Sequence, residues 1–308
     1  MYCAGAKALS PALHHLSQLA ALGLADNRIG EDGAAALAPA LGHLAALTRL
    51  NLGGNEIGAK GAQALAPALC RLSRLADLRL DDNGLGPAGA AAIASPIALL
   101  TSLTLLDLDI IDCGEEGAAT LGPALSRLSR LADVSLGQNR LGAAGVAALA
   151  PALGTLTALT RLVLTDDSVG ADGAAALASC LRHLTLLADL RLAYTGCGDA
   201  GAAALAPALQ HLTALQQLDL ASNGLGNAGA EALAPALSRL SRLAELYLHA
   251  NSIGEAGCSR LLTALPPLSP LHTFDIAFNA MSPAAMEEVA LNRLPALTSL
   301  TCLGLSPN

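Results

Sequence analysis

The sequence repeats itself every 28 residues. The stretch LAALGLADNRIGEDGAAALAPALGHL at 19–44 aligns with LTRLNLGGNEIGAKGAQALAPALCRL at 47–72 without an insertion or deletion. Ten such units cover 19–298, a partial helical unit occupies 1–18, and 299–308 repeats the strand-like start of a unit. A period of this size is typical of solenoids, in which each unit buries its apolar face only against its neighbours. We therefore expect one continuous repeat domain over residues 1–308.

Each unit has two halves with different apolar periodicity. The first half, L-x-x-L-x-L, alternates and predicts a short strand. The second half, GAAALAPALGHL, places Ala34, Leu37, Leu41 and Leu44 on one face of a helix. Strands stack about 4.8 Å apart, whereas helix axes need roughly 8–10 Å. This mismatch should bend the stack into an open α/β horseshoe, with a parallel sheet on the concave face and helices on the convex face.

Polar and small residues recur where the two halves join. The ninth position of most units is Asn, whose amide should pair with backbone groups at the strand end and from unit to unit. Ile111, Asp167 and Thr195 interrupt this column. Two glycines, such as Gly30 and Gly33, recur in nine units and predict a positive φ or a close backbone approach.

The consensus L-x-x-L-x-L-x-x-N-x-I/L-G-x-x-G-A-x-x-L resembles the leucine-rich repeats of the ribonuclease-inhibitor-like subclass. That subclass includes the sensor regions of NOD-like receptors and the Ran GTPase-activating protein. The resemblance covers essentially the whole chain and implies a right-handed β-α superhelix, with a weaker asparagine ladder where the column is interrupted. These relatives share a shape more than a chemistry, so the resemblance implies a fold and no reaction.

Composition excludes several classes of function. The 17 Lys and Arg against 25 Asp and Glu give a net charge of −8, without the dense basic face that nucleic acid requires. No apolar run approaches the ~18 residues of a membrane span. Four of the seven cysteines replace apolar residues, which predicts buried free thiols, no metal site, no cofactor and a cytoplasmic location. These four are Cys113, Cys180, Cys197 and Cys258.

Two features recur in the helical halves, and we interpret both as structural. Cations near the helix ends, such as His43 and Arg71, complement the negative helix C-terminus. Prolines inside the helices should face solvent and adjust curvature without a binding role. They are Pro39, Pro67, Pro123, Pro151, Pro207 and Pro235.

The outward-facing strand positions differ most between units. Neighbours in a column lie side by side on a parallel sheet, so opposite charges there should pair across strands. An alternative interpretation is that these pairs have no binding role and only balance charge on an exposed sheet. The expected pairs are Arg49 with Asp77, Arg79 with Asp107, Arg161 with Asp133 and Asp189, and Arg191 with Asp219.

Aromatic residues appear on this face only in the later units. We predict that Tyr194, Tyr247, His249 and Phe278 are the anchors of a protein-binding site, because aromatic side chains dominate such sites. Charged residues around them should steer a partner protein with a basic surface. These are Asp107, Asp109, Asp166, Arg191 and Asp219.

The sequence favours a non-catalytic protein-interaction module. It contains no GxxxxGK[ST] motif and no evident nucleophile with its base. One alternative is a GTPase activator of the Ran-specific type, for which Arg28 and Arg140 occupy the comparable loops. Another is the sensor region of a larger immune receptor or a bacterial effector. We expect a monomer, with self-association through the apolar first helix (Leu9, Leu13, Leu16) as the alternative.

Overall fold

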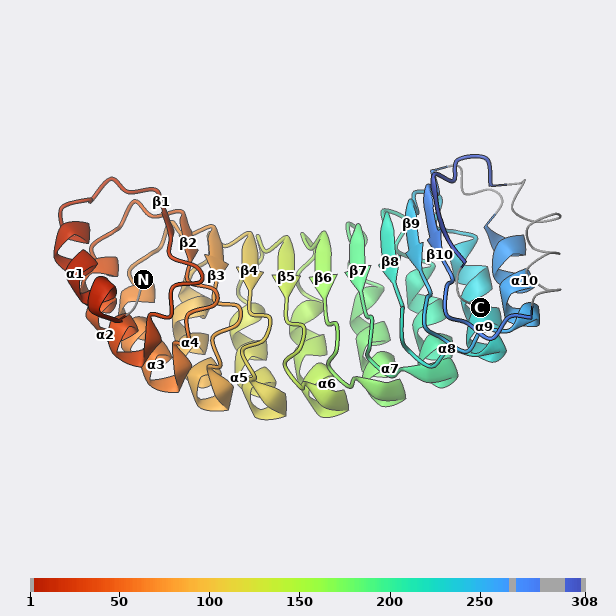
Figure 1. The fold of residues 1–308 in the computed structure, drawn as a ribbon, viewed down its shortest axis with the longest axis horizontal. Coiled ribbons are helices and arrows are strands. Elements are labelled where there is room, and N and C mark those ends of the chain that lie inside the picture. Colours follow the sequence, from red (N-terminus) through yellow and green to blue (C-terminus); the bar gives the residue numbers. More distant parts are fainter. Residues whose placement is uncertain (1–2, 266–269, 283–296, 306–308) are drawn as a thin grey trace. The chain divides into compact units, whose positions relative to one another are not determined.

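The computed structural model describes residues 3–265, 270–282 and 297–305. The chain divides into two compact units, Met1–Leu159 and Thr160–Asn308. Both units are built from alternating short strands and helices (Figure 1). The repeat of 28 residues runs through both of them, so the same reasoning explains each.

Unit 1 contains five strands, and a helix precedes or follows each of them. Its helices are α1 (Cys3–Leu13), α2 (Gly30–Leu41), α3 (Gly58–Leu69), α4 (Gly86–Leu99), α5 (Gly114–Leu125) and α6 (Gly142–Leu153). Its strands are β1 (Ala21–Gly23), β2 (Arg49–Asn51), β3 (Asp77–Arg79), β4 (Leu105–Asp107) and β5 (Asp133–Ser135). The partial unit predicted at 1–18 corresponds to α1, which packs against α2.

Unit 2 repeats this alternation. Its strands are β6 (Arg161–Val163), β7 (Asp189–Arg191), β8 (Gln217–Asp219), β9 (Glu245–Tyr247), β10 (Thr273–Asp275) and β11 (Cys302–Gly304). Its helices are α7 (Gly170–Leu181), α8 (Gly198–Leu209), α9 (Asn227–Leu237) and α10 (Glu255–Ala264). The helix predicted for the tenth repeat lies outside the described residues.

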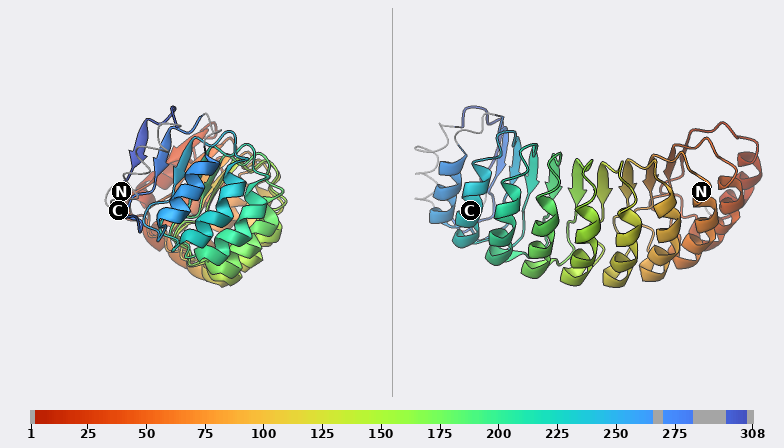
Figure 2. Two further views of the ribbon diagram at one scale, coloured as in Figure 1. Left: turned by 90° about the vertical axis from the view of Figure 1, so that its right-hand side faces the viewer. Right: turned by 180° about the vertical axis from the view of Figure 1, so that it is seen from behind.

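Consecutive strands within each unit pair in parallel, in the register that the repeat predicts. Leu50 of β2 lies opposite Leu78 of β3, a separation of one repeat. Thr273 of β10 lies opposite Cys302 of β11, one residue more than a repeat, so the extra residue is absorbed before the last strand. Figure 2 shows the helices of each unit on one side of its strands. The predicted α/β repeat with a parallel sheet is therefore confirmed.

The core lies between the strands and the helices and consists almost entirely of aliphatic side chains. Leu50 and Leu78 from the strands and Leu37 and Leu65 from the helices are all buried. Burial of one such side chain contributes about 2 kcal/mol of transfer free energy. Phe274 of β10 is fully buried at the same strand position, so one aromatic ring takes the place of a leucine.

The two glycines of the connection have different roles. Gly58 adopts a φ of +61°, which L-residues with side chains disfavour. A Cβ on Gly61 would lie 2.6 Å from Ile57 Cγ2, so this glycine permits close packing of helix on loop. Both predicted reasons for glycine are thus confirmed. In unit 2, Gly226 and Gly254 are extended instead, and α9 and α10 begin one residue later.

The asparagine ladder forms as expected. Asn55 Nδ2 donates to Leu52 O and to Leu24 O of the preceding repeat, both at 2.8 Å. Asn55 Oδ1 accepts a hydrogen bond from Asn27 N at 3.0 Å. One fully buried side chain therefore satisfies backbone groups of two repeats. Ile111 supplies neither the donor nor the acceptor, so its repeat lacks these side-chain bonds.

All seven cysteines are unbridged. The four that were predicted to be buried are buried, and the interior raises the pKa of two of these thiols. Desolvation raises the pKa of Cys180 to about 12 and that of Cys197 to about 11. These thiols therefore stay protonated and act as small apolar side chains.

Candidate functional site

The eighth residue of every repeat adopts a left-handed backbone conformation just after the strand. In all ten repeats its φ is positive, for example 58° at Tyr194 and 53° at Phe278. This conformation turns the amide of the residue toward the next repeat, where Tyr194 N bonds Ala221 O at 2.9 Å. Glycine, asparagine and aspartate tolerate it best, and four of the ten positions carry glycine or aspartate: Gly54, Asp26, Asp82 and Asp166.

Three of these left-handed positions carry large apolar side chains that are exposed. Ile110 is 41% exposed, Tyr194 56% and Phe278 59%. A bulky side chain in this backbone region costs free energy, and such strain is concentrated at functional sites. Tyr194 and Phe278 are two of the anchors predicted from the sequence, whereas Ile110 was not predicted. The signal for it was available, because Ile110 is the one β-branched residue in the column.

Tyr247 and His249 differ from these exposed anchors, because both are half-buried and held by neighbours. Tyr247 Oη donates to Glu245 Oε2 at 2.9 Å, and its ring meets that of His249 edge-on with centroids 6.4 Å apart. His249 Nδ1 lies 3.1 Å from Asp275 Oδ2, at ion-pair distance but off hydrogen-bond geometry. Desolvation, with the bond to Glu245, raises the pKa of Tyr247 to about 12. The Tyr247 phenol therefore stays protonated, and its hydrogen bond and ring contact hold the two rings together as a platform.

Arg191 forms its ion pair within its own strand. The register places it opposite Asp219, as predicted. Its Nε nevertheless lies 3.1 Å from Asp189 Oδ1, and its Nη2 lies 3.1 Å from Asp189 Oδ2. Residues two apart on a strand point to the same face, so the guanidinium reaches this carboxylate most easily. Asp219 Oδ1 instead accepts a hydrogen bond from Ala221 N at 3.0 Å.

The other predicted cross-strand pairs divide in the same way. Arg79 Nε bonds Asp77 Oδ1 of its own strand at 3.2 Å and not Asp107. Arg161 Nε does reach across to Asp189 Oδ2 at 3.1 Å, as predicted. These contacts balance charge locally, so Arg79, Arg161 and Arg191 are largely neutralised.

Asp107 and Asp109 hold the end of a strand in unit 1. Asp107 Oδ1 accepts from Asp109 N at 3.2 Å, while the Asp109 carboxylate accepts from Ser135 Oγ at 2.8 Å and from Gly137 N at 2.6 Å. Desolvation raises the pKa of Asp107 to about 6, and Asp109 and Asp81 add to this effect. Both carboxylates thus have structural roles in addition to any role in steering a partner.

The predicted site residues are distributed over both units. Asp107 and Asp109 lie in unit 1, and the other seven lie in unit 2. Within unit 2, the register places Arg191, Asp219, Tyr247 and Asp275 in one row across four adjacent strands. Desolvation raises the pKa of Asp219, opposed by His249 and Arg191. We call this surface the β7–β10 face; it consists of Asp166, Arg191, Tyr194, Asp219, Tyr247, His249, Asp275 and Phe278.

A groove on the sheet face of unit 1 was not predicted. It has a volume of about 360 Å³ and lies over β1 to β3. The small residues Ala21 and Gly23 leave this space open, and Arg49, Asn51 and Asp77 line it with polar groups. Arg49 is the register neighbour of Asp77 but forms no ion pair with it among the described residues.

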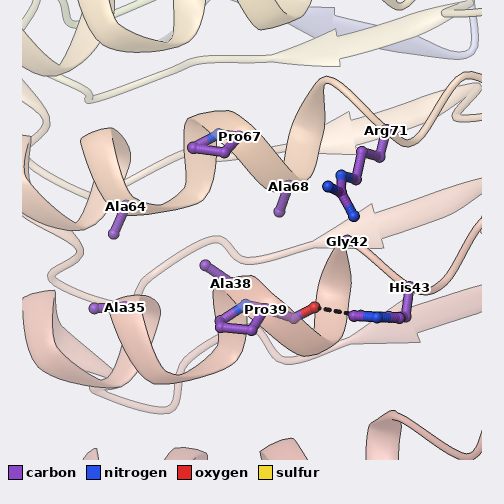
Figure 3. A pocket seen from close by; sticks show the side chains of 9 residues that line it. All are labelled: Ala35, Ala38, Pro39, Gly42, His43, Ala64, Pro67, Ala68 and Arg71. Atoms are coloured by element: carbon purple, nitrogen blue, oxygen red, sulfur yellow. Dashed lines mark hydrogen bonds between the residues drawn. The ribbon is translucent and has the colours of Figure 1, made fainter.

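A second groove lies between helices α2 and α3 on the opposite side of unit 1 (Figure 3). Its volume is about 420 Å³, and alanines with Pro39 and Pro67 form its walls. His43 and Arg71 stand at one end, where His43 Nδ1 lies 2.8 Å from Pro39 O. The prolines are exposed as predicted. They also line a groove, so their interpretation as pure curvature devices stays a hypothesis.

Neither a metal site nor a membrane span is found in the part of the chain that the structure describes. The described residues contain no group of three or more His, Cys, Asp or Glu side chains arranged to hold a metal ion. None of the helices in the described ranges combines the length and apolar character needed to cross a membrane. Arg28 and Arg140 are exposed on loops, and Arg140 Nη1 pairs with Asp112 Oδ1 at 3.0 Å.

Comparison with known proteins identifies the type of repeat. A family model described as Leucine Rich repeat matches residues 43–66, 75–94 and 211–234, which lie in both units. No curated protein matches the sequence significantly. The family match and the fold together support a leucine-rich repeat protein, and such repeats generally act as protein-interaction modules.

Three of the solved structures to which the chain is similar come from bacteria. An internalin from Listeria monocytogenes has 19% identity and a TM-score of 0.47, over 99% of this chain and 95% of that chain. Internalin C2 from the same organism has 19% identity and a TM-score of 0.46, over 79% and 92%. A leucine-rich repeat protein from Leptospira interrogans has 17% identity and a TM-score of 0.41, over 97% and 87%.

Proposed function

We propose that this chain is a non-catalytic module that binds a partner protein through the β7–β10 face. The observation that carries the proposal is the pair of large rings, Tyr194 and Phe278, exposed on a strained left-handed backbone. A monomer gains nothing from exposing such rings, whereas a partner that buries them gains apolar contact area. The Tyr247–His249 platform lies on β9 and the turn that follows it, so it adds a preorganised contact.

The charge of this face favours a partner with a basic surface. The arginine in its row, Arg191, is already neutralised by Asp189, while Asp166 is exposed at a left-handed position. Asp219 and Asp275 keep carboxylate oxygens at the half-buried row. The uncompensated charge near the rings is therefore negative, which steers a positively charged protein surface.

The finer classification is part of the same proposal. The helices of 12 residues that recur through most repeats support the ribonuclease-inhibitor-like subclass. The unbridged cysteines support a reducing, cytoplasmic compartment. We further propose that the chain forms one continuous domain and is a monomer in solution.

A truncation of the three rings tests the proposal. The Tyr194→Ala/Tyr247→Ala/Phe278→Ala variant should lose the partner that the wild-type chain captures, with each central ring contributing about 2 kcal/mol to binding. Binding of the captured partner is then measured by titration calorimetry.

The matched control is Leu99→Ala/Leu186→Ala, which removes two exposed apolar side chains outside the β7–β10 face. The control should bind as the wild type does. If the triple variant retains every partner at unchanged affinity, the β7–β10 face is not the binding site.

A further inference from the structure

The turns that lead from each helix to the next strand contain basic residues in several repeats and no acidic residues. Among the described residues, the turns within 14–20, 42–48, 70–76, 100–104, 126–132, 154–160, 182–188, 210–216 and 238–244 contain no Asp or Glu. The chain nevertheless has more acidic than basic residues overall. In unit 1 the cationic side chains of these turns are Arg71, Arg74, Arg127, Arg130, His14, His15 and His43. We call the four arginines the basic turns of unit 1.

These arginines are exposed and have no carboxylate partner. Each of the four is solvent-exposed. The ion pairs of the described residues, such as Lys60 with Glu31, involve other cations. Several acidic residues of unit 1 lie at the other end of the repeats, in the loops that follow the strands, as Asp26, Asp82 and Asp112 do, and others lie on the strands. The acidic residues of unit 1 thus lie away from the basic turns.

The helix dipole explains only part of this pattern. His43 lies at the end of α2 and contacts the Pro39 carbonyl there, as a cation or donor at a helix C-terminus should. Arg74 and Arg130 stand five residues after α3 and α5 end, beyond the last turn to which the dipole effect is confined. The helix dipole therefore does not account for these two arginines.

The arginines of unit 1 occur as pairs in its second and fourth repeats. The segments RLSR at 71–74 and 127–130 are identical and 56 residues apart. Leu72 and Leu128 between them are fully buried and fix the turn. The first arginine of each pair also lines a groove between two helices: Arg71 between α2 and α3, and Arg127 between α4 and α5. Figure 3 shows Arg71 at the end of an alanine- and proline-lined groove.

We propose that the basic turns of unit 1 bind an acidic segment of a partner protein. Each pair of guanidinium groups would bind a carboxylate, because arginine donates two parallel hydrogen bonds to a carboxylate. Small apolar side chains of the segment would enter the grooves beside Arg71 and Arg127. Helices in such stacks lie roughly 8–10 Å apart, so the two pairs are at most about 20 Å apart, a span of roughly 13 residues in a helical segment.

A polypeptide fits these turns better than a nucleic acid does. Nucleic acid presents one charge per roughly 2 Å of duplex, and binding requires many phosphates to be neutralised together. Arginine pairs in alternate repeats would leave most of those phosphates unpaired, and the acidic loops of the same unit would repel them. Carboxylates spaced along a protein segment match a sparse set of cations. The partner proposed here is acidic, whereas the partner proposed for the β7–β10 face is basic. The two surfaces therefore bind different ligands.

The experiment uses the full chain and a fluorescein-labelled amphipathic peptide of about 20 residues that is rich in Glu, Ala and Leu. Fluorescence anisotropy should show binding at low salt that weakens as salt is added. The variant Arg71→Gln/Arg74→Gln/Arg127→Gln/Arg130→Gln should bind the peptide at least about tenfold more weakly, since four exposed contacts are lost.

The matched control is Lys7→Gln/Arg28→Gln/Lys60→Gln/Arg140→Gln, which makes the same change in net charge at exposed sites elsewhere in unit 1. It should change the affinity less than about twofold. The Tyr194→Ala/Tyr247→Ala/Phe278→Ala variant should bind the peptide normally, which separates this proposal from the proposed function. Thermal melts followed by circular dichroism verify that all variants are folded.

Four results would overturn the proposal. The first is no binding of the peptide by the wild type, and the second is an equal loss in the control, which would reflect net charge alone. The third is tighter binding of a single-stranded oligonucleotide of equal charge. The fourth is self-association of the wild-type chain that the arginine variant abolishes, which would make a second copy the ligand of the basic turns.

Discussion

At the scale of single residues, the fifth position of the repeat makes the same hydrogen bond with either a neutral or a charged side chain. The fifth residue of a repeat accepts a hydrogen bond from the backbone two residues on, whether it is Asn51, Asp107, Asp219 or Asp275. Asparagine does this without charge, whereas aspartate brings a carboxylate into a half-buried row. Burial of the carboxylate is therefore costly for stability.

Asp107 makes this cost measurable through pH. Its ordinary pKa of 3.8 rises to about 6 in the folded protein, because burial disfavours the charged form. As the pH rises from about 4 to about 6, the unfolded chain loses this proton before the folded protein does, so Asp107 makes stability fall across that window. Asp107→Asn keeps the acceptor and should stabilise the protein by about 1 kcal/mol at pH 7, after allowance for solvent screening.

Urea unfolding at about pH 7 and pH 4 checks this, since the gain should shrink toward the lower pH. Asp82→Asn, which changes an exposed carboxyl in the preceding repeat, is the control and should have little effect at either pH. A gain for Asp107→Asn that is equal at both pH values would mean that the carboxyl charge is not its cause.

At the scale of elements, the asparagine ladder ties each strand end to the next repeat. Short strands of three residues offer few hydrogen bonds of their own, so side-chain amides supply the rest. Thr195 shows a partial substitute, because its Oγ1 donates to Leu192 O at 3.0 Å and to Asn223 Oδ1 at 2.6 Å. A hydroxyl has one proton to share, whereas an amide has two, so threonine satisfies fewer carbonyls than asparagine does.

Removal of one ladder amide should therefore be costly. Asn55→Ala leaves the backbone amides of Asn27 and Ile29 without their acceptor and removes one of the side-chain donors to Leu24 O and Leu52 O. We expect a loss of about 3 kcal/mol in the free energy of unfolding, measured by chemical denaturation. Asn27→Ala, at a half-buried position in the first repeat, should cost clearly less. Equal costs would show that the amide contributes only locally and that the contacts between repeats add nothing.

At the scale of the whole molecule, each repeat depends on its neighbours and on little else. Helix packs on the next helix and strand pairs with the next strand throughout each unit. Stability in such a chain is approximately a sum of repeat terms and nearest-neighbour terms. Local damage should accordingly remain local.

Leu37→Ala tests this within unit 1. Leu37 is fully buried in α2, and its truncation should cost about 3 kcal/mol. Hydrogen exchange should then accelerate in α1, α2 and α3 but not in α5 or α6. Leu99→Ala, which shortens an exposed side chain, should leave exchange unchanged. Uniform acceleration from α1 to α6 would show that the unit unfolds as one cooperative body.

The sequence by itself determined the repeat, the alternation of strand and helix, the buried leucines and cysteines, and the ladder. Periodic patterns suffice for these features, because each repeat meets copies of itself at a known offset. The parallel register and the position of Tyr247 on an outward strand face follow from the same periodicity.

Only the tertiary structure decided how side chains share a face. It showed that Arg79 and Arg191 pair within their strands, that Ile110 stands exposed on a left-handed backbone, and that prolines line a groove beside Arg71. These outcomes depend on local dihedral angles and on which neighbour a flexible side chain reaches first. A periodic sequence pattern predicts neither the dihedral angles nor the side-chain partners, because equivalent positions in different repeats differ only in their three-dimensional surroundings.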